Sequence, residues 1–159
     1  MMILTLAFFF VHNPSAWAGE KCSVFERAED LDFDLEMNSE APLDDFLEPA
    51  QALYDELLKY DPYRLGCGKL QLVDAQRNIE YILGKLYLWR FEMSGKQSDL
   101  MKALPLLKKA VRGRRGDEAR YLLGRAKVAY GWQQKPSSRA WSLEIEGLKD
   151  MLEALSGKF

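Results

Sequence analysis

Along most of the chain, apolar residues recur every three or four positions, which is the spacing of one face of an α helix. The pattern predicts five helices, over about residues 43–60, 69–93, 99–112, 117–131 and 138–155. In the last of these helices the apolar stripe consists of Trp141, Ile145, Leu148, Leu152 and Leu155. Because the loops between the five segments are short, we expect neighbouring helices to pack as antiparallel pairs.

The amino-acid composition favours the same fold class. From Gly19 onward the chain has 23 Leu and 12 Ala, but only four Val, three Ile and no Thr. Leucine and alanine keep their rotamer freedom in a helix, whereas β-branched residues pack best on a sheet. The sequence therefore predicts an all-α protein.

The segment before the first predicted helix has a different pattern. Leu31, Phe33 and Leu35 alternate with acidic residues, which is typical of an extended segment with one apolar edge. Residues 19–62 carry 14 acidic and 3 basic residues, whereas residues 63–159 carry 10 acidic and 19 basic residues. We hypothesise that this acidic arm covers a basic surface of the helices. The alternatives are that its apolar edge packs permanently against the first helix, or that the arm is disordered.

The first residues of the chain resemble a signal peptide. The apolar run Ile3–Val11 is followed by Pro14 and then by Ala16-Trp17-Ala18-Gly19, a small-x-small cleavage site. The run is too short to span a membrane, which takes about 20 apolar residues. We therefore expect export to the periplasm or the medium, cleavage after Ala18 and no stable membrane insertion.

Export changes the expectation for the two cysteines, Cys22 and Cys67. An even number of cysteines in an oxidising compartment favours a disulfide over free thiols. We therefore predict that Cys22 and Cys67 are joined. The sequence divides into a signal peptide over residues 1–18, an acidic arm over residues 19–42 and a helical domain over residues 43–159.

An internal repeat gives the most specific signal. The run Tyr81-Ile82-Leu83-Gly84-Lys85 returns 40 residues later as Tyr121-Leu122-Leu123-Gly124-Arg125. Glycine inside a helix costs about 1 kcal/mol relative to alanine, so we expect a neighbouring helix to approach closely at both positions. A fixed period of helix pairs is typical of a helical repeat array.

These motifs resemble the tetratricopeptide repeat, a 34-residue helix-turn-helix unit. Leu83, Gly84 and Tyr87 fit the first helix of that unit, and Ala103, Leu107 and Ala110 fit the second. The resemblance implies a right-handed array of about five helices with a C-terminal capping helix. It is degenerate, because Gly84 and Ala103 are seven residues further apart than the repeat allows. A plain helical bundle is the alternative.

The resemblance also implies a binding surface on the concave side of the array. Counting from Gly84 and Gly124, the predicted binding residues are Asn78, Tyr81, Lys85, Trp89, Tyr121 and Arg125, and the same count also gives Glu118. These aromatic and basic side chains suit an acidic or carboxylate-ended peptide, since arginine can bind a carboxylate with two hydrogen bonds. The alternative is that the tyrosines pack between helices and that the basic side chains are only solvated.

No motif in the sequence supports catalysis. After residue 18 the chain has no histidine, no thiols at metal-ligand spacing and no glycine-rich phosphate loop. We therefore expect no catalytic residue, no metal, no cofactor and no nucleic-acid partner. Our prediction is an exported, non-catalytic adaptor that binds a protein or peptide through its helical surface, and the alternative is a structural helical subunit of a larger envelope complex.

Overall fold

The computed structural model describes residues 23–38, 41–59, 68–134 and 137–157, and within these ranges it is built from helices without any strand. The helices are α1 (Ser23–Met37), α2 (Leu43–Lys59), α3 (Lys69–Ser94), α4 (Gln97–Ala110), α5 (Gly116–Gln133) and α6 (Ser138–Ser156). The predicted all-α class is confirmed, and α2 to α6 correspond to the five predicted helices. The predicted signal peptide and both cysteines lie outside the described residues.

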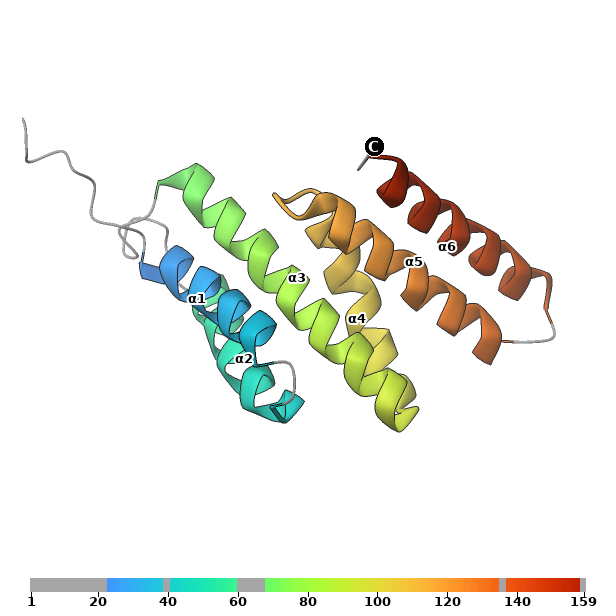
Figure 1. Ribbon diagram of the computed structural model, residues 1–159, viewed down its shortest axis with the longest axis horizontal. Coiled ribbons are helices and arrows are strands. Elements are labelled where there is room, and N and C mark those ends of the chain that lie inside the picture. The colour runs from blue at the N-terminus through green and yellow to red at the C-terminus, as the bar shows by residue number, and fades with distance from the viewer. Residues whose placement is uncertain (1–22, 39–40, 60–67, 135–136, 158–159) are drawn as a thin grey trace, which may run out of the picture.

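The helices follow one another across the molecule, from α1 and α2 at one end to α6 at the other (Figure 1). The long helix α3 contacts α1, α2, α4 and α5, whereas the substantial contacts of α6 are with α5 alone. Among the described residues, no helix is long and apolar enough to cross a membrane.

The expectation of an extended arm is wrong, because residues 23–37 form the helix α1. Val24, Ala28 and Leu35 share one face of that helix and are at most 1% exposed, while Phe33 is 62% exposed. The alternating pattern covers only three apolar positions, and burial of a helical face outweighs it. The acidic segment is therefore part of the packed structure.

Glycine allows two helix pairs to approach closely, as the internal repeat predicts. A Cβ atom at Gly84 of α3 would lie 2.7 Å from the Leu107 side chain of α4. A Cβ atom at Gly147 of α6 would lie 2.5 Å from the carbonyl oxygen of Gly124 in α5. Both contacts are much closer than ordinary packing permits, so each glycine fixes the distance between its helix and the next.

The contact between α5 and α6 is formed largely by small residues. The buried residues of α6 are Ala140, Gly147 and Ala154, at seven-residue spacing. Ala140 lies against Gly131 of α5, in the same way as Gly147 lies against Gly124. Because the small residues face α5, the predicted apolar stripe of α6 is left outside, with exposed fractions between 46% and 68%. An apolar stripe usually faces the core of a protein, but in α6 the small residues take that side.

Candidate functional site

Five of the six predicted binding residues line one cavity of about 270 Å³, here called the groove. Tyr81, Lys85 and Trp89 come from α3, and Tyr121 and Arg125 come from α5. The remaining lining residues are Asp117, Glu118 and Leu122 of α5 and Ala154 and Leu155 of α6. The seventh position counted from the repeat, Glu118, is thus also present. The structure brings together residues that the 40-residue period placed on two separate helices.

Lys85 has an aromatic environment within the groove. Its Nζ atom lies 4.8 Å from the ring centroid of Trp89 and 5.7 Å from that of Tyr81, both within cation–π range. Burial lowers the pKa of Lys85, because desolvation disfavours the ammonium, although Asp32 and Glu36 oppose the shift. The ammonium is therefore held by ring faces and nearby carboxylates, in a place that a ligand carboxylate can approach.

Tyr81 is the most enclosed of the five predicted binding residues in the groove, at 4% exposure. Its hydroxyl donates a hydrogen bond of 3.0 Å to Glu118. Burial, followed by the negative charge of Glu118, raises the pKa of Tyr81 well above its usual value. Tyr81 thus stays neutral and acts as a fixed wall, which agrees with the alternative that it packs between helices.

The outer part of the groove is more accessible. Tyr121 is 37% exposed, and Arg125 forms an ion pair of 2.5 Å with Glu92 of α3. That ion pair is itself partly exposed, so a competing carboxylate can replace Glu92 without uncovering a buried charge. Tyr121 and Arg125 are therefore the predicted residues that a partner can reach most directly.

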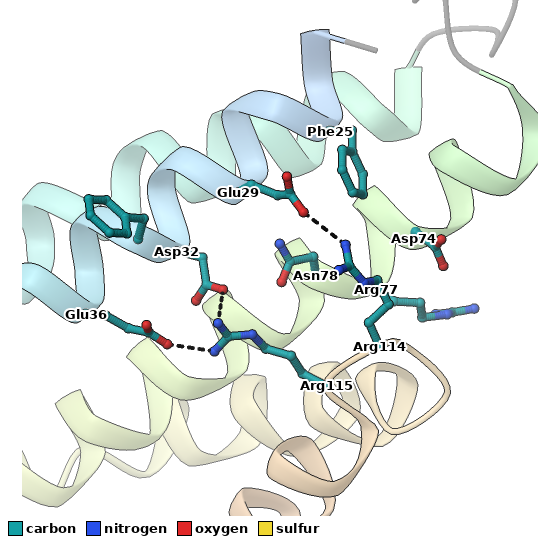
Figure 2. A pocket seen from close by; sticks show the side chains of 10 residues that line it. Phe25, Glu29, Asp32, Glu36, Asp74, Arg77, Asn78, Arg114 and Arg115 are labelled. Carbon is teal, nitrogen blue, oxygen red and sulfur yellow. Dashed lines mark hydrogen bonds and ion pairs between the residues drawn. The ribbon is translucent and has the colours of Figure 1, made fainter. Parts of the chain in front are cut away.

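Asn78 lies apart from the groove, in a second cavity of about 320 Å³ (Figure 2). The cavity is bounded by α1, α3 and the turn before α5, and its lining is mostly charged. The side-chain amide of Asn78 donates to the backbone oxygen of Ala28 at 3.4 Å. This contact ties α3 to α1, so the position assigned to binding has a structural role here.

Arg115 lines the second cavity and was not singled out from the sequence. Its guanidinium lies 2.7 Å from Asp32 and 2.9 Å from Glu36, both on α1, as Figure 2 shows. It also lies 3.2 Å from Glu118, and 5.2 Å from the ring centroid of Tyr81. One arginine thus connects the acidic helix α1 to the inner wall of the groove. The only sequence signal for it was its position in the basic run before α5.

The carboxylates that Arg115 binds have different environments. Burial raises the pKa of Asp32 despite the opposing charge of Arg115, and its Oδ1 atom is buried without a hydrogen-bond partner. A hydrogen bond from Arg115 lowers the pKa of the more exposed Glu36. The acidic segment therefore meets the basic surface at Arg115, through one buried and one accessible carboxylate.

The described residues contain no group of three or more His, Cys, Asp or Glu side chains placed to hold a metal ion. No known protein family, curated protein or solved structure that was compared with the chain matches it. The resemblance to tetratricopeptide repeats therefore stays a prediction from the sequence motifs.

Proposed function

We propose that the chain is an exported, non-catalytic adaptor of the tetratricopeptide-repeat type, which binds a protein or peptide partner in the groove. The observation that carries the proposal is the convergence of Tyr81, Lys85, Trp89, Tyr121 and Arg125 on one cavity. Tyr81 and Tyr121, and likewise Lys85 and Arg125, occupy equivalent positions of the 40-residue repeat, on α3 and α5. A repeat array accounts for equivalent positions that share one surface, which supports it over a plain bundle.

Packing within the helix pairs supports the repeat-like part of the proposal. Gly84 of α3 contacts Leu107 of α4, and Gly124 of α5 contacts Gly147 of α6. The second contact therefore repeats the first, with each of its two residues 40 positions further along the sequence. Along α5 and α6 the contacts run in opposite order, since Gly131 meets Ala140 while Gly124 meets Gly147. This order is the one expected of an antiparallel helix pair, and it supports a repeat-like arrangement.

The charges of the groove indicate which partner it suits. Lys85 and Arg125 are balanced by Asp117 and Glu118, so the groove has no strong net charge that would attract any acidic protein. Selectivity among partners would come from a single carboxylate of the partner near Lys85 and Arg125. Apolar contacts of the partner with Trp89 and Tyr121 would add to it. We therefore expect a short segment with one acidic or terminal carboxylate beside an apolar side chain.

Affinity capture from the native envelope, with the mature domain as bait, tests this proposal. Tyr121→Ala and Arg125→Ala should each reduce capture of the specific partner at least tenfold, about 1.4 kcal/mol. Phe33→Ala is the matched control, because it removes an exposed aromatic ring from α1, outside the groove. Capture that is equal for all three variants would contradict the groove as the binding site.

The alternative function, a helical subunit of a larger envelope complex, is favoured by one observation. The apolar stripe of α6 is exposed, and monomeric proteins rarely expose a contiguous apolar surface of several hundred Å². A permanent subunit would fail to assemble into the larger complex when the stripe is changed, whereas Tyr121→Ala would leave its assembly unchanged. The same capture experiment with Ile145→Glu therefore separates the two functions.

A further inference from the structure

The exposed side of α6 has the pattern of a helix-pairing surface. Trp141, Ile145, Leu148, Leu152 and Leu155, here called the α6 stripe, follow one another at intervals of four, three, four and three residues. Their exposed fractions are 58%, 66%, 51%, 68% and 46%. The 4-3 spacing is that of the seam between two helices in a coiled coil. The helix lies at one end of the molecule, and its substantial contacts are with α5 (Figure 1).

The packing of α6 against α5 leaves about half or more of each stripe residue exposed, although Leu155 also lines the groove. The small residues of α6 already form its contact with α5, so the large side chains of the stripe add little to it. The internal repeat provides a comparison, because positions 40 residues earlier lie on α4 and in the turn that follows it. Met101, Pro105 and Lys108 of α4 and Arg112 of the turn are all exposed, and two of them are cationic. The same face of the preceding helix pair is thus exposed without being an apolar stripe.

The charges around the stripe argue against a lipid surface. Helix α6 carries Arg139 and Lys149 as its basic residues, and its acidic residues are Glu144, Glu146, Asp150 and Glu153. Helices that lie on membranes carry lysine and arginine on their polar face, which attract anionic lipids. An acidic helix therefore suits a protein surface better than a lipid surface.

We propose that the α6 stripe binds the α6 stripe of a second copy of this chain, so that the protein forms a symmetric dimer. The stripe contains no charge, and three of the four acidic residues of α6 are paired with basic residues of α5. Lys127 of α5 binds Glu146 and Asp150, and Arg120 binds Glu153 at 2.8 Å. Two identical surfaces can therefore meet without net repulsion between like charges.

The area of the stripe is sufficient for a reversible dimer. Five half-exposed large side chains present roughly 500 Å² of apolar surface in each copy, or about 1,000 Å² in the pair. This value lies at the lower limit for specific interfaces, which supports association at micromolar rather than nanomolar concentration. The dimer does not depend on the groove, which is lined by different residues except for Leu155.

Sedimentation equilibrium of the full mature chain between about 1 and 100 μM tests the dimer. Non-reducing gel electrophoresis of the same samples checks that no disulfide joins two copies. The wild-type protein should pass from monomer to dimer over this range. Ile145→Glu and Leu152→Glu should each weaken association at least tenfold, because they place a carboxylate at the centre of the seam. Both residues are more than 60% exposed, so the fold of the monomer should be retained, and circular dichroism checks this.

Leu70→Glu is the matched control, since it makes the same substitution at a leucine of α3 that is 82% exposed and outside the stripe. This variant should associate as the wild type does. A wild-type protein that stays monomeric at about 100 μM would overturn the proposal, as would a dimer that the stripe variants leave unchanged. Binding to anionic vesicles that Ile145→Glu abolishes would assign the stripe to a lipid surface instead.

Discussion

Replacing Gly147 with alanine tests whether close approach of α5 and α6 holds the end of the molecule together. The added methyl group would lie 2.5 Å from the carbonyl oxygen of Gly124 and 2.9 Å from the side chain of Val128. Backbone lies on one side of the new atom, so rotation of a side chain cannot relieve the contact. The two helices must move apart, which also weakens the contacts of Ala140 and Ala154.

Two opposing effects set the magnitude. Alanine is favoured over glycine inside a helix by about 1 kcal/mol, so propensity alone predicts stabilisation. Overpacking of a well-packed contact destabilises by about 1–3 kcal/mol, and here both helices have to shift. We expect the second effect to prevail, lowering the free energy of unfolding by about 1–2 kcal/mol and Tm by roughly 3–8 °C.

Thermal unfolding followed by far-UV circular dichroism measures this change. Gly84→Ala is an internal comparison, because the added Cβ atom would lie 2.7 Å from the buried side chain of Leu107 and 3.2 Å from its backbone nitrogen. Its nearest backbone contact is longer than the 2.5 Å contact at Gly147, so Gly84→Ala should be destabilising but less so than Gly147→Ala. Ser142→Ala is the control for propensity at an exposed position of α6 and should leave Tm almost unchanged. If Gly147→Ala is as stable as the wild type or more so, the close approach of the two helices is wrong.

Four further predictions concern other parts of the molecule. Hydrogen bonds from Arg90 lower the pKa of the buried Asp99. The stabilisation that they provide is therefore present above about pH 3.8 and is lost as the pH falls through the lower native pKa. Asp99→Asn should remove this part of the acid dependence of stability, which urea unfolding at a series of pH values measures. A thiol assay on denatured, unreduced protein should find no free thiol, as expected if Cys22 and Cys67 are joined. Two titratable thiols in exported material would contradict the disulfide. Mass spectrometry of protein recovered from its host should place the N-terminus at Gly19, whereas a retained first methionine would exclude cleavage. Because the apolar face of α1 is buried, hydrogen exchange should show α1 equally protected at about 0.05 M and about 1 M salt, and protection lost at high salt would indicate an arm held mainly by charge.

Helical periodicity predicted α2 to α6 well because each of these segments carries an apolar face over several turns. It failed for α1, where a short alternation of Leu31, Phe33 and Leu35 hid the longer spacing of Val24, Ala28 and Leu35. Three apolar residues that alternate with acidic ones are too few to distinguish a strand from a helix. The deciding contribution was tertiary burial against α2 and α3, which no local pattern contains.

The candidate site was predictable to a similar extent. The repeat period placed Tyr81 and Tyr121 at equivalent positions, and these residues share the groove. The partners of the charged residues were not predictable, since the contacts of Arg115 with α1 and of Arg125 with Glu92 join residues distant in sequence. The orientation of α6 was also missed, because alanine and glycine at seven-residue spacing give little hydrophobic signal and leucine dominates the pattern.

The unequal number of neighbours of α3 and α6 has a consequence for local unfolding. Helix α3 packs against four other helices, whereas α6 depends on α5, so the amide groups of α6 should open far more often than those of α3. Each such opening removes Ala154 and Leu155 from the groove while Trp89 and Lys85 stay in place. A ligand that touches both sides of the groove would therefore bind only the closed form. Binding of such a ligand would therefore slow amide exchange throughout α6, including the middle of the helix, which lies outside the groove.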